Sequence, residues 1–137
     1  MGLETKEDEM SEPIVFISHF KVKEGKEESL LQLNEKVTAQ IKTDKPGTVG
    51  FLLFMNQAGN ELSIVHVFPD AESFDRHVEG VGERSNASLE FIEPIGREAY
   101  GMPGDQVLTM LEPPEEYEMT FRHVPKFSNG FLRLMKG

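Results

Sequence analysis

The chain has 137 residues, enough for one domain with flanking tails, and its 24 acidic and 14 basic side chains give a formal net charge of -10. This charge argues against nucleic acids and membrane surfaces as partners, because both are anionic and attract proteins through Lys and Arg. The chain has no cysteine, which excludes a disulfide scaffold, a thiolate nucleophile and a cysteine-ligated metal centre. It also has no apolar run long enough to span a bilayer.

The first twelve residues, MGLETKEDEMSE, are acidic and polar and offer little to bury. They are the reverse of a secretory signal peptide, which needs a basic start and an apolar stretch. We therefore expect residues 1–12 to form a disordered tail and the protein to be cytoplasmic.

An alternating apolar segment begins at Ile14. Through residues 14–22 apolar side chains occupy both faces of the alternation, which is typical of a strand covered on both sides. A turn at residues 23–26 leads into an expected helix, whose apolar stripe consists of Leu30, Leu33, Val37 and Ile41. Pro46 and Gly47 end that helix.

Two further strands follow, joined by a turn. Residues 48–55 are apolar on both faces, residues 56–60 have hairpin-turn composition, and residues 62–68 alternate again. Pro69 keeps Phe68 extended, and Asp70 is a good N-cap for a second helix. We expect that helix to bury Ala71, Phe74, Val78 and Val81.

The pattern is weaker beyond the second helix. We expect a short helical segment at residues 86–92, interrupted by Pro94, and a fourth strand at residues 107–111 after a turn at residues 101–104. Residues 119–124 have the composition of another strand. The apolar side chains that follow it need burial, and they are Phe127, Phe131, Leu132 and Leu134.

The expected element order is therefore β-α-β-β-α-β, the ferredoxin-like α+β arrangement with an antiparallel sheet, over residues 13–111. Helices of such a sheet cover only one face, whereas the expected strands are apolar on both. The same face of a second copy is the economical cover, so we expect a homodimer through the sheet. We expect residues 112–137 to form a C-terminal extension that packs on the domain or on a partner subunit.

Four short segments, in this order, resemble the antibiotic biosynthesis monooxygenase-like members of the dimeric α+β barrel superfamily. They are FKVKEGK at residues 20–26, Pro46-Gly47, FPDAESF at residues 68–74 followed by His77, and Tyr100-Gly101. The resemblance covers about residues 14–111. It implies that two sheets face each other in a dimer, and that each subunit keeps a small pocket between its sheet and its helices.

The resemblance also implies a class of chemistry, namely cofactor-free oxygenation of phenolic compounds, quinol oxidation or haem degradation. The chain departs from the family at three points. Phe68 stands where members usually have Trp or Tyr, His66 stands where an acidic residue is frequent, and residues 84–89 offer no axial histidine for haem. Haem degradation is therefore disfavoured, and we expect no cofactor.

His77 lies at the edge of the apolar stripe of the second helix, where the family often has a histidine that points to the pocket. A neutral imidazole there could take a proton from a phenol, and the resulting phenolate would react with dioxygen. The alternative is a boundary histidine that makes one ordinary hydrogen bond.

His19 and His66 form a second candidate site. They lie late in the first and third strands, which are neighbours in the ferredoxin-like order, and we place both on one face beside Ile17 and Phe68. Such a pair could orient an acidic or phenolic ligand or, with a carboxylate, bind a divalent metal, although no regular ligand spacing supports a metal. Two interior histidines hydrogen-bonded across the dimer are the alternative.

Asn56, at the end of the second strand, and Tyr100 could add polar groups to the pocket, as such side chains do in phenol-oxidising members of the family. For Asn56 the alternative is turn formation, and for Tyr100 it is a half-buried aromatic.

Two functions remain open. The first is a cofactor-independent monooxygenase for a small aromatic or quinonoid compound, with His77 and His66 as catalytic residues. Its substrate contacts would be His19, Asn56, Phe68 and Tyr100. The second is a non-catalytic dimeric module that binds a small apolar ligand or serves as a structural subunit. A lyase or isomerase on the same fold is a third alternative.

Overall fold

The computed structural model describes residues 12–116 and 118–134, except for the side chains of residues 82–85. Residues 1–11 of the expected acidic tail lie outside the described residues. The described part of the chain contains, in order, β1 (Ile14–Val22), α2 (Glu27–Asp44), β2 (Gly50–Met55), β3 (Glu61–Phe68), α3 (Ala71–Val78), α4 (Val81–Ser88), β4 (Ile92–Tyr100), α5 (Asp105–Leu111) and β5 (Thr120–Val124).

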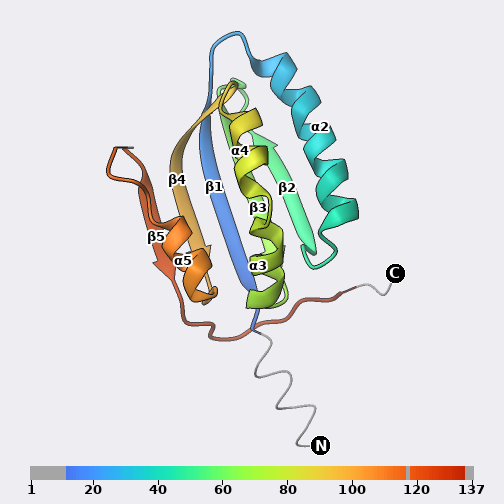
Figure 1. The fold of residues 1–137 in the computed structure, drawn as a ribbon, viewed down its shortest axis with the longest axis vertical. Helices are drawn as coiled ribbons and strands as arrows, with labels where there is room; N and C mark the ends of the chain where they lie inside the picture. Colours follow the sequence, from blue (N-terminus) through green and yellow to red (C-terminus); the bar gives the residue numbers. More distant parts are fainter. Residues whose placement is uncertain (1–11, 117, 135–137) are drawn as a thin grey trace, which may run out of the picture.

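The strands form one sheet in the order β2-β3-β1-β4-β5. Strand β1 pairs antiparallel with β3 and β4, β2 pairs antiparallel with β3, and β5 runs parallel to β4 at one edge. Figure 1 shows the helices over one face of this sheet. The first four strands thus have the expected ferredoxin-like α+β arrangement, and β5 extends it with a strand from residues 112–137.

The elements up to residue 78 form where the sequence predicts them. Strand β1 is central, as its two apolar faces indicate. The side chain of Asp70 caps α3 by accepting a hydrogen bond of 2.8 Å from the backbone N–H of Ser73. This cap fixes the rotation of α3, so that Phe74 and His77, three residues apart, both face the sheet and are buried.

The prediction of a fourth strand at residues 107–111 is wrong, because these residues belong to helix α5. Val107 and Leu111 are buried and four residues apart, about one helical turn, whereas Thr109 between them is exposed. Gly104 is extended and Asp105 lies in the first turn, where its charge is favourable to a helix start. The apolar run VLTML hides this helical spacing.

Residues 92–100 form the fourth strand instead, and the prediction of a helix at residues 86–92 holds only in part. Helix α4 ends at Ser88, and Ile92 already begins β4. The register between β1 and β4 shifts between His19 and Phe20, which pair with Gly96 and Pro94 and leave Ile95 as an extra residue. Proline is tolerated in a sheet at such a bulge, which explains why this strand has an untypical sequence.

The sheet has an inner face toward the helices and an outer face on the opposite side. The outer face of the first three strands is largely apolar, as expected, and carries Val15, Ile17, Leu52, Phe54, Val65 and Val67. Strand β4, which is not one of the expected strands, differs, because its outward residues Glu98 and Tyr100 pair with Ile17 and Val15 and are polar. The outer face therefore has an apolar part over β2, β3 and β1 and a polar part over β4.

Two clusters of buried side chains lie between the sheet and the helices, one at each end of β1. The first contains Ile14 and the stacked rings of Phe68 and Phe74, whose centroids are 4.5 Å apart. The second contains Val22 with Leu30 of α2. Between these clusters, the middle of β1 presents the small side chain of Ser18 to the inner face.

Residues 125–134 follow β5 without a helix or a strand. Phe127 is partly buried, whereas Phe131 is 78 % exposed and Leu132 and Leu134 are also exposed. A single copy of the chain therefore does not bury these apolar side chains. None of the helices in the described ranges is long and apolar enough to cross a membrane.

Candidate functional site

A cavity of about 410 Å³ lies between the inner face of the sheet and helices α2, α3, α4 and α5. Its walls are mainly apolar, with Phe16 and Phe20 from β1, Phe51 from β2, and Met110 from α5 among the lining side chains. Its size and composition are those of a small-molecule site, in which a few polar groups fix the orientation of the ligand.

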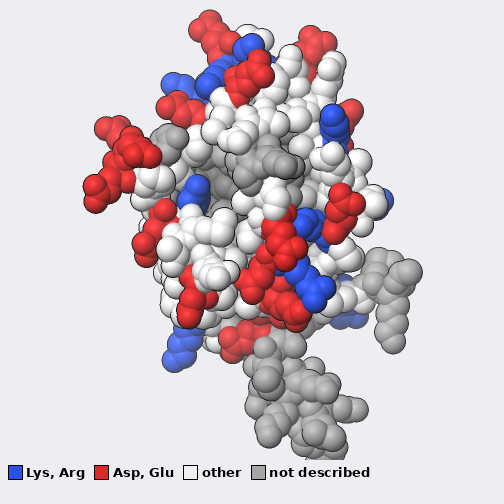
Figure 2. Space-filling model, in the orientation of Figure 1, with Lys and Arg blue, Asp and Glu red and all other residues white. Residues whose placement is uncertain are grey.

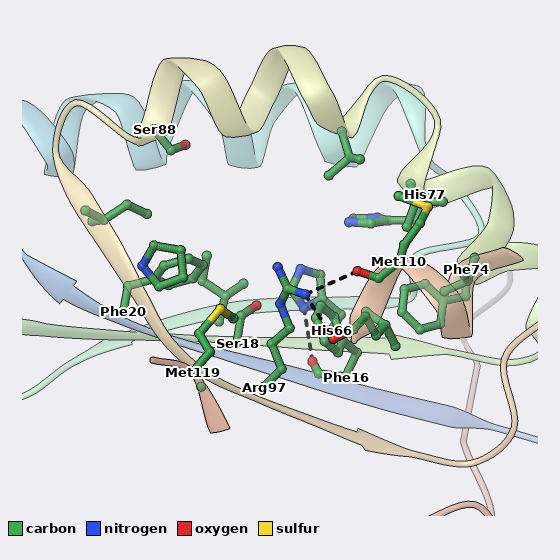
Figure 3. Close-up of a pocket in the computed structure, with 18 of the residues that line it drawn as sticks. Phe16, Ser18, Phe20, His66, Phe74, His77, Ser88, Arg97, Met110 and Met119 are labelled. Atoms are coloured by element: carbon green, nitrogen blue, oxygen red, sulfur yellow. Dashed lines mark hydrogen bonds between the residues drawn. The ribbon is translucent and has the colours of Figure 1, made fainter. Parts of the chain in front are cut away.

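Among the described residues, the polar side chains of this cavity come from five different elements. They are Ser18 on β1, His66 on β3, His77 on α3, Ser88 on α4 and Arg97 on β4. Figure 3 shows Ser18, His66 and Arg97 rising from the sheet, with Ser88 and His77 on the helices opposite them. The chain thus places polar groups on both sides of an apolar space.

His77 lines the cavity and is 5 % exposed. Its Nδ1 lies 2.7 Å from Oγ1 of Thr48, the residue two positions before β2, and this hydrogen bond fixes the orientation of the ring. Pro46 and Gly47 lie directly before Thr48, in the segment that connects α2 to β2. A Cβ on Gly47 would lie only 2.7 Å from Oγ of Ser73. Glycine at this position therefore lets the segment that carries Thr48 approach α3.

His66 is 7 % exposed and faces the same cavity, because β3 places it opposite Phe16. Its Nδ1 donates a hydrogen bond of 3.0 Å to the carbonyl oxygen of Phe16, which places the proton of a neutral ring on Nδ1 and the lone pair on Nε2. The rings of His66 and His77 meet edge to face with centroids 5.0 Å apart.

Arg97 is the residue of this site that the sequence analysis missed. It pairs with Ser18 in the β1–β4 register and enters the cavity from β4. Its Nη1 donates hydrogen bonds to the backbone carbonyls of Met110 and Leu111, at 3.2 and 3.0 Å, where α5 ends. Burial lowers the pKa of Arg97. No signal in the sequence could assign this residue to the cavity while β4 itself was not recognised.

The prediction that His19 and His66 share a face is wrong. His19 pairs with Ser63 and His66 pairs with Phe16, so His19 lies on the outer face and His66 on the inner face. The two strands are neighbours, as predicted, but the alternation along β1 puts residues 16 and 19 on opposite sides. No ligand or metal can be held by these two histidines together.

His19 instead belongs to a chain of hydrogen bonds on the outer face. Its Nε2 donates to Oε2 of Glu98 at 2.6 Å, and its Nδ1 lies 2.9 Å from Oγ of Ser63. The hydroxyl of Tyr100 donates to Oε1 of Glu98 at 2.7 Å. The hydrogen bonds from His19 and then from Tyr100 lower the pKa of Glu98, and the bond to Glu98 raises the pKa of Tyr100.

Three other residues expected at the pocket lie elsewhere. Asn56 is exposed in the β2–β3 turn, where its amide bonds Asn60 and the backbone of Glu61. Tyr100 lies on the outer face. Phe68 is fully buried and packs against His77, with the two ring centroids 5.2 Å apart.

Residues 13–81 match the family model described as antibiotic biosynthesis monooxygenase, and the chain belongs to this family. The match covers β1 to the start of α4, which includes His66, His77 and Thr48 but not Arg97. Among curated proteins, none matches the sequence.

Solved structures share the fold. MupZ from Pseudomonas fluorescens superposes with a TM-score of 0.63 and 15 % identity, over 89 % of this chain and 95 % of MupZ. SnoaB from Streptomyces nogalater, a cofactor-independent oxygenase, gives a TM-score of 0.57 and 17 % identity, over 68 % of this chain and 95 % of SnoaB. Protein SO0527 from Shewanella oneidensis gives 0.54 and 22 %, over 66 % and 90 %.

Proposed function

We propose that the protein is a cofactor-independent monooxygenase that acts on a small aromatic or quinonoid compound in the inner cavity. The observation that carries the proposal is the pair of buried imidazoles, His66 and His77, at one end of an apolar cavity in a member of the antibiotic biosynthesis monooxygenase family. The similarity in fold to SnoaB, a cofactor-independent oxygenase, supports the same reading.

In the proposed reaction, His77 is the base. It takes the hydroxyl proton of a bound phenol, and the hydrogen bond between Nδ1 and Thr48 keeps the ring in place. The imidazolium of His77 then donates a hydrogen bond to the phenolate oxygen, while the ring of His66 packs edge to face against the ring of His77. The phenolate gives electrons to dioxygen, one oxygen atom enters the ring as a new carbonyl and the other leaves as water, so that a phenol and dioxygen become a quinone and water. The apolar walls keep bulk water from the reacting carbon.

We also propose that two copies pair through the outer face of the sheet. The apolar part of that face includes Leu52 and Phe54, which are 51 % and 57 % exposed in a single copy. An apolar patch that spans three neighbouring strands is uncommon on a free surface. Because the patch lies on the face without helices, a two-fold related copy can cover it with the identical patch.

The catalytic proposal is tested by uptake of dioxygen and incorporation of isotopically labelled oxygen, with a panel of phenols, naphthols and hydroquinones. We expect His77→Ala to lower kcat by about 100-fold on any compound that the wild type turns over, the range for loss of a general base. The matched control is His123→Ala. His123 lies on β5, where its Nε2 donates to the carbonyl of Gly101, and it does not line the cavity.

Unchanged turnover in His77→Ala would refute the role of His77. If the wild type consumes no dioxygen with the whole panel but binds its members, the non-catalytic binding module becomes the better description. Dimerisation would remain a separate question, because it depends on the other face of the sheet.

A further inference from the structure

Arg97 places a positive charge in the apolar cavity, on a strand that is not adjacent to the strand of His66. Arg97 lies on β4, opposite Ser18, while His66 lies on β3, opposite Phe16, so that β1 runs between them. The two flanking strands are separated by about 10 Å, twice the spacing of neighbouring strands. Figure 3 shows both side chains directed into the cavity from the sheet.

The charge of Arg97 is not neutralised by the described side chains. Its hydrogen bonds go to two backbone carbonyls of α5, and among the described residues no carboxylate lies within ion-pair distance. Burial lowers its pKa, yet a guanidinium stays protonated in proteins at neutral pH. A cation held in this way has a strong preference for an anion that enters the cavity.

The geometry of the guanidinium leaves donors for such an anion. Both hydrogen bonds to α5 come from Nη1, so that the Nη2 and Nε edge contacts no acceptor among the described residues. The two carbonyls therefore hold the guanidinium plane at a fixed angle. A carboxylate suits the remaining edge, because its two oxygens accept two parallel hydrogen bonds from arginine.

We propose that the ligand of this cavity is an aromatic acid whose carboxylate binds Arg97 and whose hydroxyl lies at His66 and His77. This inference rests on the proposed function for the hydroxyl end and names the substrate class for it. Phe16 and Ser18 on β1 lie between the strands that carry Arg97 and His66, and both line the cavity, so an aromatic ring can lie over them. Acidic side chains predominate on the helix-bearing surface, as Figure 2 shows. Because that surface repels anions, the attraction for the carboxylate comes from Arg97 itself.

The test is anaerobic binding of 6-hydroxy-2-naphthoic acid and of its methyl ester, which has nearly the same shape and no charge. The fluorescence of the naphthalene ring reports binding, and the chain has no tryptophan to interfere. We expect the wild type to bind the acid at least roughly tenfold more tightly than the ester, as a charge-assisted bidentate contact would give. In Arg97→Gln the acid and the ester should bind equally, with the affinity for the ester unchanged.

The matched control is Arg122→Gln on β5. This arginine is exposed and lies opposite Glu98 in the pairing of β4 with β5. This variant should keep the preference for the acid. Because Arg97 also bonds α5, Arg97→Lys is made in parallel, and it should keep part of the preference because it keeps the charge. Equal binding of acid and ester by the wild type would overturn the proposal, as would a full preference in a folded Arg97→Gln.

The outcome can be separated from that of the catalytic proposal, because binding is measured without dioxygen. His77→Ala should retain the preference for the acid over the ester. A preference that depends on Arg97 in a protein without oxygenase activity would leave the carboxylate site standing and remove only the reaction. Oxygenase activity on neutral phenols without that preference would do the opposite.

Discussion

One chain of hydrogen bonds crosses three strands of the outer face and joins Ser63, His19, Glu98 and Tyr100. An ionised carboxylate can only accept, so His19 donates from Nε2 to Glu98 and, as a neutral ring, accepts at Nδ1 from the Ser63 hydroxyl. Every group in the chain therefore has a defined role. Its stabilising effect depends on the negative charge of Glu98.

This charge makes one contribution to stability depend on pH. The pKa of Glu98 is below its ordinary value of 4.5 in the folded protein, so its contribution is present above that value and is lost as the pH falls through the folded pKa. We expect Glu98→Gln to be less stable than the wild type near neutrality, and to lose less of its stability between about pH 6 and about pH 3.5. Urea denaturation at both pH values measures this difference.

The control for this prediction is Glu93→Gln, a substitution at an exposed position of the same strand. Its pH dependence should follow the wild type. If Glu98→Gln also follows the wild type throughout the acid range, the hydrogen-bonded chain does not stabilise the ionised carboxylate.

At the scale of elements, α5 and β4 determine whether the cavity exists at all. Helix α5 closes one end of the cavity and supplies the carbonyls that hold Arg97, and β4 supplies Arg97 itself. Sequence patterns predicted β1, β2, β3 and the two longer helical regions because each has clear alternation, helical spacing or a capping residue. They failed at β4, where Pro94, Gly96 and a bulge interrupt the alternation, and at α5, whose seven residues span only two turns.

The helical spacing of α5 gives a direct test. Leu111 is 5 % exposed, so Leu111→Ala should lower the free energy of unfolding by about 2–4 kcal/mol. Thr109→Ala should change it by less than about 0.5 kcal/mol, because Thr109 is exposed. In a strand, residues 109 and 111 would share a face and the two substitutions would have similar effects. Thermal or urea unfolding of the two variants decides between these arrangements.

The candidate site was predictable only where a residue's own element was recognised. His77 and His66 were found because a capped helix and an alternating strand place them toward the inner face. Arg97 was not, because β4 was not recognised, and His19 was assigned to the wrong face because side-chain alternation along β1 was not carried through to the pairing with β3.

At the scale of the whole molecule, the two faces of the sheet have different proposed tasks, ligand binding inside and pairing of copies outside. We expect Leu52→Glu to convert the proposed dimer into a monomer, because it places a charge within the apolar part of the outer face, opposite Val65. Native mass spectrometry and light scattering at matched concentration measure the change.

Leu31→Glu is the matched control, because Leu31 is 47 % exposed on α2 and Leu52 is 51 % exposed on the outer face. The control variant should keep the mass of the wild type. A monomeric wild type, or a Leu52→Glu variant that is still dimeric, would contradict pairing through this face.

Gly96, next to the bulge of β4, lines the inner cavity and also a smaller hollow of about 270 Å³ that His19 and Ser63 share. A Cβ at this position would lie 2.6 Å from Oγ1 of Thr120, so glycine lets β4 and β5 approach here, and Phe20 lines both hollows as well. The inner cavity, where the ligand is proposed to bind, and the smaller hollow therefore have wall residues in common. Whatever factor a ligand at Arg97 applies to the affinity between two copies, pairing applies the same factor to the affinity for that ligand.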